Sequence, residues 1–309
     1  RLGLPLVFIS FASSIFFQMS VFTPRRNQQD LQHVMNPGGW TIVCLSDTHA
    51  QLHKMSSDIP AGDILIHAGD FSRKGEKKEL QQFYQAFNDL PHPIKLFIAG
   101  NHEITLDKEH FLHKGDGLRS YFKPGSNMTA ENYHAICRNI LMPPNARANS
   151  PHYLQDESFF INTNLPDEND EILPDRNQQL KVYGSPWQPR HYTMAFNLNR
   201  GAQLAEKWRK IPSDVDLLIT HTPPHLILDE SNSGIKCGCE ALTRFFRDGI
   251  ISPRLHIFGH IHEQHGVEYR GNTLFVNAAT CDVGYKPIQQ PIVVFLPFDK
   301  SLPAQILSL

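Results

Sequence analysis

The chain has 309 residues, of which 40% are hydrophobic and 19% are charged, and its formal net charge is −2 at pH 7. This is the composition of an ordinary globular protein, long enough to bury a large core in one or two domains. Because the charge is slightly negative, it excludes non-specific binding to nucleic acid polymers as the default function.

Residues 1–38 are predicted to be a leader before the folded body. Leu2–Phe17 is strongly apolar behind one positive charge, long enough for a signal-peptide core and short for a membrane-spanning helix. A signal or anchor segment and a disordered or misassigned stretch both stay open, and membrane association is expected only through residues 1–20. The five cysteines match no disulfide framework or zinc ribbon, which favours the cytoplasm unless the leader is a targeting segment.

The folded body is predicted to span residues 39–299 and to begin with alternating strands and helices. Between Lys77 and Leu90 the apolar residues recur at the spacing of an amphipathic helix. Around it, three continuous apolar runs predict buried strands at Trp40–Leu45, Ile64–His67 and Ile94–Ala99. This alternation predicts a layered α/β fold.

Residues 105–178 are predicted to be a less regular insertion. Within it, Asn162–Asn177 is rich in carboxylates and predicts an exposed acidic loop, since charge runs are usually solvated. The regular pattern then resumes, and residues 300–309 are expected to form a C-terminal tail. The predicted helices are Ala202–Lys210 and Ala241–Phe246, and the predicted strands are Leu217–Thr220, Leu255–Phe258, Val267–Tyr269, Thr273–Asn277 and Ile292–Leu296.

Five of the predicted strands are followed at once by residues that can bind metal ions. Loops after the carboxyl ends of strands in an α/β fold converge, so these residues can meet in space. Imidazoles with carboxylate and amide oxygens suit borderline divalent ions such as Mn, Fe or Zn, and the absence of cysteine argues against a thiolate site. The clusters are Asp47-Thr48-His49, Gly69-Asp70, Gly100-Asn101-His102, His221 and Gly259-His260-Ile261-His262.

The spacing within these clusters suggests how they are used. Residues separated by one position project to the same side of an extended segment. Asp47 with His49, and His260 with His262, are therefore each predicted to address one metal centre. Asp70 stands alone after a glycine and is the natural bridge between two ions, which a shared carboxylate holds roughly 3.5–4 Å apart.

Other residues near the clusters are predicted to be structural. His67 precedes Gly69-Asp70 within a strand and is expected to be a hydrogen-bonded core histidine. Trp187 is expected to pack against its neighbours instead of stacking on a base. His53, His225 and His265 lie near the motif loops and could support the ligands, and no single one of them is singled out.

The order of the five clusters resembles that of the calcineurin-like metallophosphoesterase superfamily. The stretch Tyr183–Pro189, which contains Gly-Ser-Pro-Trp-Gln-Pro, is similar to the metallophosphoesterase-domain-containing (MPPED) subfamily of animal proteins. The resemblance covers about residues 40–297. It implies a four-layer α-β-β-α sandwich with mixed sheets and the metals at the strand ends.

The resemblance also implies a role for each residue of the clusters. Asp47, His49 and His262 would hold one ion, Asn101, His221 and His260 would hold the other, and Asp70 would bridge them. His102 would be a catalytic residue and not a ligand, protonating the leaving oxygen or steadying the transition state. Some members lack the histidine that corresponds to His260 and are weakened as enzymes; its presence here predicts an enzyme.

The resemblance to the subfamily implies hydrolysis of a small phosphodiester, such as a cyclic nucleotide, by a hydroxide that two divalent metal ions activate. The expected partner is therefore a small phosphodiester or nucleotide, with no nucleic acid polymer. Two alternatives stay open. One is a phosphomonoesterase or protein phosphatase that uses the same site, and the other is a low-activity scaffold that binds metals.

Overall fold

A computed structural model describes residues 21–22, 38–55, 58–113, 127–147, 149–162 and 179–309. These residues form two mixed β-sheets and a small separate strand pair, β8 (Gln188–Pro189) with β9 (Asn197–Leu198). In spatial order, the seven-stranded sheet contains β1 (Val21–Phe22), β6 (Glu157–Asn162), β7 (Gln179–Ser185), β10 (Leu217–Thr220), β11 (Leu255–Phe258), β13 (Thr273–Asn277) and β12 (Gly266–Arg270). The six-stranded sheet contains β15 (Gln305–Ser308), β14 (Ile292–Pro297), β2 (Gly39–Leu45), β3 (Ile64–His67), β4 (Ile94–Phe97) and β5 (His152–Tyr153).

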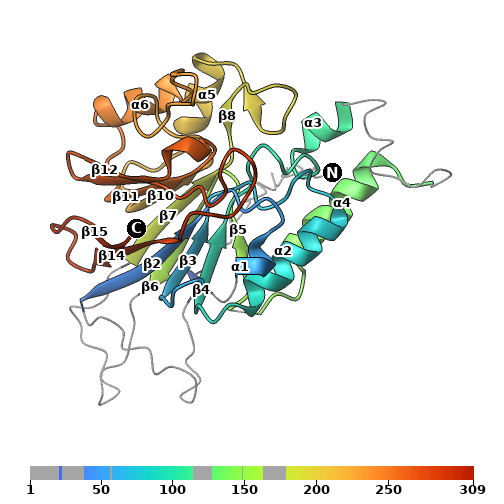
Figure 1. The fold of residues 1–309 in the computed structure, drawn as a ribbon, viewed down its shortest axis with the longest axis horizontal. Helices are drawn as coiled ribbons and strands as arrows, with labels where there is room; N and C mark the ends of the chain where they lie inside the picture. Colours follow the sequence, from blue (N-terminus) through green and yellow to red (C-terminus); the bar gives the residue numbers. More distant parts are fainter. Residues whose placement is uncertain (1–20, 23–37, 56–57, 114–126, 148, 163–178) are drawn as a thin grey trace, which may run out of the picture.

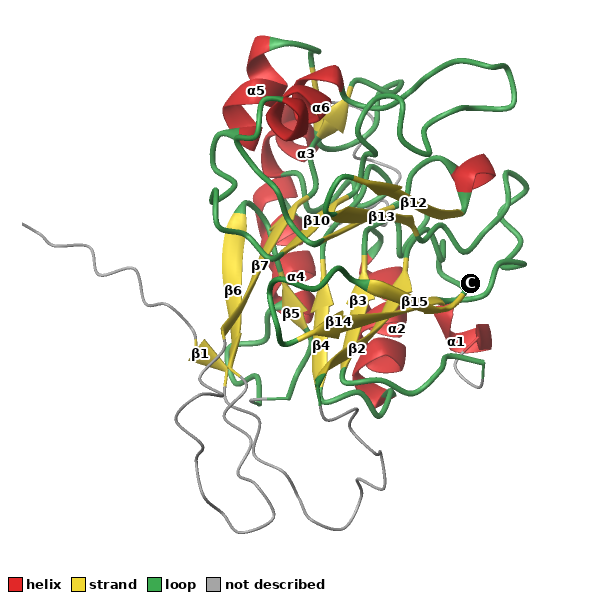
Figure 2. Ribbon diagram, turned by 90° about the vertical axis from the view of Figure 1, so that its left-hand side faces the viewer, coloured by secondary structure: helices red, strands yellow, loops and turns green. Residues whose placement is uncertain are grey.

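The two sheets pack face to face, and helices cover both outer faces (Figures 1 and 2). On the six-stranded sheet lie α1 (Leu52–Met55), α2 (Lys77–Asp89) and α4 (Ala130–Leu141), with α3 (Lys108–His113) against α4. On the seven-stranded sheet lie α5 (Ala202–Trp208) and α6 (Glu240–Arg247). The four-layer α-β-β-α sandwich is therefore confirmed.

The apolar character of the strands follows from burial on both faces. Ile42 and Ile66 of one sheet lie in the core between the sheets with Ile219 and Ile257 of the other. The next residue in β2, Val43, faces the opposite way and packs under the helices. Because successive strand residues point to opposite faces, a strand covered on both sides must be apolar throughout. This explains why the strands are visible in the sequence as continuous apolar runs.

The helix α2 shows how the outer layers attach. It spans Lys77–Asp89, close to the predicted range, and buries Leu80, Phe83 and Phe87 against the sheet. Phe83 stacks on Phe71 with ring centroids 4.0 Å apart. At the first turn, the Glu79 carboxylate accepts the backbone N–H of Glu76 at 3.1 Å, which satisfies a donor that the helix leaves free.

The prediction of a less regular insertion at residues 105–178 was wrong for its described part. That part contains α3, α4, β5 and β6. Helix α4 begins after Thr129, whose hydroxyl accepts the backbone N–H of Asn132 at 3.2 Å. The helix was missed because its buried face includes His134 and Cys137 and so lacks a strong apolar stripe.

Two predicted segments lie largely outside the described residues. The acidic loop at 162–177 is described only at Asn162, and the leader at 1–38 only at residues 21–22 and 38. Val21 and Phe22 form β1, which pairs in parallel with β6. Among the helices that the structure describes, none is both long enough and apolar enough to cross a membrane.

The residues expected as a C-terminal tail include a strand. Gln305–Ser308 forms β15, which pairs antiparallel with β14 at the edge of its sheet. Three of its four residues are exposed and the fourth is half-buried, so it lacks the apolar run that marks the central strands. The tail prediction is therefore corrected to an edge strand for these residues.

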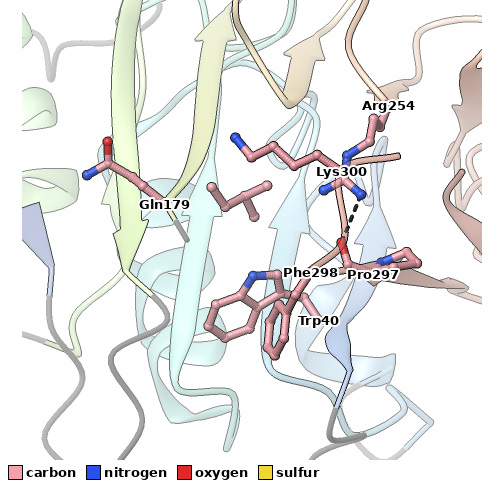
Figure 3. A pocket seen from close by; sticks show the side chains of 7 residues that line it. Trp40, Gln179, Arg254, Pro297, Phe298 and Lys300 are labelled. Carbon is pink, nitrogen blue, oxygen red and sulfur yellow. Dashed lines mark hydrogen bonds between the residues drawn. The ribbon is translucent and has the colours of Figure 1, made fainter. Parts of the chain in front are cut away.

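The amino ends of the central strands are closed by Arg254, which precedes β11. Arg254 is 6% exposed, and its guanidinium donates to the carbonyl oxygen of Pro297 at 2.8 Å (Figure 3). It also donates to the carbonyl oxygen of Asp299 at 3.2 Å. Trp40 packs edge-to-face on Phe298 in the same place, with ring centroids 5.4 Å apart. These bonds anchor the segment after β14, so this end of the sandwich is structural.

Candidate metal centre

The residues predicted for the site lie together at the other end of the sandwich. The parallel strands β2, β3 and β4 lead into the loops of Asp47, Asp70 and Asn101. The parallel strands β10 and β11, from the other sheet, lead into the loops of His221 and His260. The prediction that carboxyl ends of five strands converge is confirmed, with the added finding that both sheets contribute.

The potential ligand atoms form three overlapping groups in the described part of the chain. One contains Asp47, His49 and His262; a second contains Asp70, His221 and His260; a third contains His49, Asp70 and His102. Within each group the atoms lie within 4.8 Å of one another. Asp70 belongs to two groups and lies between the other residues, which is the position expected of a shared carboxylate. Asn101 joins the second group, because its Oδ1 lies 3.1 Å from Nε2 of His221.

The prediction from spacing was wrong for His260 and His262. They face different groups, while Asp47 and His49 share one as predicted. The loops are not extended at these positions, because φ is 69° at His260, 53° at Asp47 and 42° at His49. A left-handed residue rotates the chain, so the alternation of an extended strand no longer applies. Two of the three groups keep His262 apart from His260, while the third adds His102 beside His49 and Asp70.

Glycines before the ligands allow unusually close contacts. A Cβ on Gly259 would lie 2.0 Å from Oδ2 of Asp47, and a Cβ on Gly100 would lie 2.2 Å from Oδ1 of Asp70. The space lets the backbone N–H of His260 donate to Asp47 at 3.0 Å and that of His102 donate to Asp70 at 2.9 Å. Each aspartate is thus oriented by a loop from a different strand.

The first group places a fully buried carboxylate beside two imidazoles. Burial raises the pKa of Asp47, but the hydrogen bond and charge of His262 and the charge of His221 hold it well below its usual range. Burial lowers the pKa of His262, yet Asp47 raises it overall to about 9. His262 donates Nδ1–H to the carbonyl of Asp282 at 2.9 Å, which directs Nε2 toward Asp47 Oδ1 at 3.3 Å and His49 Nε2 at 3.2 Å.

The second group likewise places a buried imidazole beside a buried carboxylate. His221 donates Nδ1–H to the carbonyl of Ala68 at 2.9 Å, so its Nε2 faces Asp70 Oδ2 at 3.3 Å. Burial lowers the pKa of His221, but Asp70 raises it overall to about 9. The ring of His260 lies 5.0 Å from that of His221, and burial together with this neighbour holds the pKa of His260 well below its ordinary value.

These residues fit a pair of divalent cations. Two buried carboxylates, Asp70 and Asp47, raise the pKa of His221 and His262 respectively, so these parts of the site favour positive charge. His49 Nδ1 is buried and has no hydrogen-bond partner among the described residues, and buried Asp47 Oδ1 faces the imidazole of His262 at 3.3 Å. The available atoms are imidazole nitrogens and carboxylate and amide oxygens, the mixture that suits Mn, Fe or Zn.

His102 differs from the other histidines of the site. Its Nδ1–H donates to the carbonyl of Arg73 at 2.7 Å, and its side chain is 17% exposed. Nε2 lies 3.9 Å from Asp70 Oδ2, farther than the Nε2 of His221. The arrangement leaves Nε2 able to face a bound molecule as well as Asp70.

Glu103 has a structural role in the site that the sequence did not reveal. Its buried carboxylate accepts the backbone N–H of Asp70 at 2.9 Å, of Gly100 at 2.7 Å and of Ser72 at 2.8 Å. Burial and the charge of Asp70 raise its pKa to about 7. It joins the loops after β3 and β4. The Gly-Asn-His-Glu motif pointed to this position but not to these bonds.

Two aromatic residues beside the ligands were also missed. The ring of Tyr285 lies 4.6 Å from that of His49, and the ring of His191 lies 5.2 Å from that of His260. Neither follows a strand that carries a ligand, so no local pattern marks them.

His67 and Trp187 are structural, as predicted. His67 is fully buried, and its Nε2 lies 2.9 Å from the Thr48 hydroxyl. Trp187 packs on Phe196 with ring centroids 5.5 Å apart. The Trp187 indole N–H donates to Asp156 at 2.9 Å, so both residues have partners within the protein.

Comparison with known proteins places the chain among phosphoesterases. Residues 41–264 match the family model described as calcineurin-like phosphoesterase. Metallophosphoesterase domain-containing protein 1 of Homo sapiens is 40% identical over 264 residues, covering 84% of this chain and 72% of the human protein. A UPF0046 protein of Caenorhabditis elegans is 37% identical over 256 residues, covering 83% and 75%. A solved crystal structure with 13% identity covers 86% of this chain and 97% of its own at a TM-score of 0.53, which supports the fold.

Proposed function

The chain belongs to the calcineurin-like phosphoesterase family, and from this premise we propose that it is a metal-dependent phosphodiesterase acting on a small phosphodiester such as a cyclic nucleotide. The family makes it a hydrolase of phosphoric esters. The observation that carries the proposal is the position of Asp70, whose carboxylate lies within reach of both His49 and His221. A shared carboxylate is what a two-metal centre requires.

The residues divide between the two ions as follows. Asp47, His49 and His262 would hold one, Asn101, His221 and His260 would hold the other, and Asp70 would be shared. When bound, such a pair of divalent ions supplies an activated water at neutral pH and neutralises charge on the phosphoryl oxygens. The carbonyls of Ala68 and Asp282 fix the imidazoles of His221 and His262 in the orientation that this binding needs.

His102 would act on the leaving group. The carbonyl of Arg73 holds Nδ1–H, so the ring can carry a second proton at Nε2 and present it to an oxygen of the substrate. Its partial exposure places it at the surface where a substrate arrives. The backbone N–H of His102 meanwhile orients Asp70, so one residue links the shared carboxylate to the leaving group.

The choice of a diester is supported by the resemblance of the Tyr183–Pro189 stretch to the MPPED subfamily. The test compares hydrolysis of bis-p-nitrophenyl phosphate and p-nitrophenyl phosphate with Mn²⁺ added, and EDTA as the control. We expect the diester to have the higher kcat/KM. A preference for the monoester would instead identify a phosphomonoesterase or protein phosphatase. Bound metal without hydrolysis of either would identify a scaffold.

A further inference from the structure

Tyr285 places an exposed aromatic ring directly beside the metal centre. Its ring centroid lies 4.6 Å from that of His49, 5.8 Å from that of His262 and 6.0 Å from that of His102, each in an edge-to-face arrangement. The side chain is nevertheless 42% exposed. Tyrosines that serve packing in this protein are buried, as Tyr153 and Tyr183 are at 3% and 2% exposed. Tyr285 is therefore in contact with the site without being part of the core.

The backbone holds Tyr285 in this position at a conformational cost. Its φ is 59°, in the left-handed region that disfavours residues with a Cβ. The loop compensates through several bonds. Tyr285 N–H donates to the carbonyl of Asp282 at 2.9 Å, the Asp282 carboxylate accepts the N–H of Lys286 at 2.8 Å, and the Gln51 side chain donates to the carbonyl of Tyr285. Strain that neighbouring structure maintains is typical of functional positions.

The same loop also positions a ligand of the metal centre. The Asp282 carbonyl that accepts from Tyr285 N–H also accepts from His262 Nδ1. Asp282 thus links the backbone of Tyr285 to a ligand of the first group. A phosphoester held by that group and flanked by His102 would have one substituent close to the exposed part of Tyr285.

We propose that Tyr285 is a specificity-determining residue that contacts a planar aromatic substituent, either an aryl ester or a nucleobase, of the phosphoester bound at the metal centre. The proposal rests on the proposed function, because it takes the phosphoryl group to be held at the metal centre, beside His102. Rings pair favourably with other rings in offset or edge-to-face contact, and such contacts tolerate different bases. An aliphatic substituent of the same phosphoryl group would gain less from the tyrosine.

The test measures binding instead of turnover. Dissociation constants of phenylphosphonate and methylphosphonate are measured by calorimetry on Mn²⁺-saturated full-length protein. We expect wild type to bind phenylphosphonate roughly tenfold more tightly than methylphosphonate. Tyr285→Ala should lose this preference, measured as the ratio of the two dissociation constants, and Tyr285→Phe should keep it. Tyr285→Leu keeps a bulky side chain without a planar ring and should resemble the alanine variant. It serves as the test if Tyr285→Ala does not fold.

Tyr269 provides the matched control. It is 48% exposed. In the sheet it pairs with Leu274, which in turn pairs with Leu255 at the start of β11. Tyr269 therefore lies away from His260, which follows the other end of β11. Tyr269→Ala should keep the preference for phenylphosphonate. The inference is overturned if wild type shows no preference, or if Tyr285→Ala and Tyr285→Leu retain it. If the wild-type protein hydrolyses no phosphoester but still prefers phenylphosphonate, the proposed function is overturned. The contact between Tyr285 and the aromatic substituent would then still hold.

Discussion

His260 and His262 are separated by one residue, yet they face different groups of metal-binding atoms: His260 joins Asp70 and His221, and His262 joins Asp47 and His49. The backbone between them is not an extended strand, because φ is 69° at His260. One short loop after β11 therefore serves both halves of the centre. If these groups act as one dinuclear site, changes to either half should alter metal binding and turnover together.

Replacing the shared carboxylate should abolish activity. Asp70→Asn keeps the size of the side chain but removes the charge near His49 and His221, so we expect turnover of bis-p-nitrophenyl phosphate to fall roughly 10³-fold. Asp229→Asn is the control, because Asp229 is also a buried carboxylate that accepts backbone N–H groups, from Leu226 and Gly238 at 3.0 Å. An active Asp70→Asn enzyme would contradict the shared role.

His102 should matter for turnover and not for metal content. His102→Ala removes the ring that can protonate the leaving oxygen, and we expect kcat to fall roughly 10²- to 10⁴-fold. Metal stoichiometry, measured by atomic absorption, should match wild type. His113→Ala is the control, because the exposed His113 ring also donates to a backbone carbonyl, that of Glu109. Loss of one metal equivalent in His102→Ala would show that His102 is a ligand.

Divalent metal should stabilise the fold. Buried His49 Nδ1 has no hydrogen-bond partner among the described residues, and buried Asp47 Oδ1 faces only the imidazole of His262 among them, so a bound ion would compensate for their burial. At a metal concentration of a hundred times Kd, the stabilisation of about 2.7 kcal/mol corresponds to a rise in Tm of roughly 5–10 °C.

The measurement is a thermal melt with Mn²⁺ or Zn²⁺ and again with EDTA. Ca²⁺, which prefers sites made of oxygen atoms, should produce a smaller rise. His262→Ala should reduce the rise because it removes one imidazole from the first group. Identical melting curves with Mn²⁺, with Zn²⁺ and with EDTA would refute the prediction.

Gly259 should be intolerant of a side chain for a reason specific to the site. In Gly259→Ala the new Cβ would lie 2.0 Å from Asp47 Oδ2 and 2.2 Å from Ser46 Oγ, so Asp47 must move. We expect a loss of about 1–3 kcal/mol in the free energy of unfolding, together with weaker metal binding.

Gly249→Ala separates these two effects. Gly249 has φ of 66°, but no atom lies within 4 Å of the position that a Cβ would occupy, so alanine there meets backbone strain alone. We expect some loss of stability and unchanged metal affinity, measured by denaturant unfolding and by calorimetry. Unchanged metal affinity in Gly259→Ala as well would show that the close contact does not position Asp47.

Buried His256 should make the fold sensitive to acid. Burial lowers its pKa to about 3, against about 6.5 in the unfolded chain. Below pH 6.5 the unfolded state therefore binds a proton that the folded state does not. The contribution of His256 is fully present above pH 6.5 and is lost as the pH falls toward 3, by up to about 1.4 kcal/mol per pH unit.

His256→Phe tests this dependence. The ring stacks on Phe246 with centroids 5.3 Å apart, so phenylalanine can replace it. Thr220 loses the contact of its hydroxyl with His256 Nε2 at 2.8 Å but still donates to the Thr222 carbonyl at 2.7 Å. The free energy of unfolding of the variant should fall less steeply between pH 6.5 and pH 5. Parallel profiles for the two proteins would rule out the assignment.

The parts of the fold that could be predicted from sequence are those with a local cause. A strand such as Ile64–His67 is buried on both faces and is therefore an unbroken apolar run, and Asp70 follows it closely. Helix α4 and strand β15 lack such a run, because a histidine faces the core in one and solvent covers most of the other.

The parts of the site that could not be predicted depend on contacts between distant segments. The bonds of Glu103 form only when the loops after β3 and β4 are adjacent, and the position of Tyr285 depends on the loop that Asp282 holds. The separation of His260 from His262 accompanies a left-handed backbone at His260, which the spacing of the motif does not reveal.

The two sheets each contribute ligands to both groups of metal-binding atoms. Asp47 comes from the six-stranded sheet and His262 from the seven-stranded one, and Asp70 and His221 are divided in the same way. Each bound ion would therefore be a cross-link between the halves of the sandwich. In the metal-bound protein the two sheets should unfold together in one cooperative transition. Metal should be released as the sheets separate.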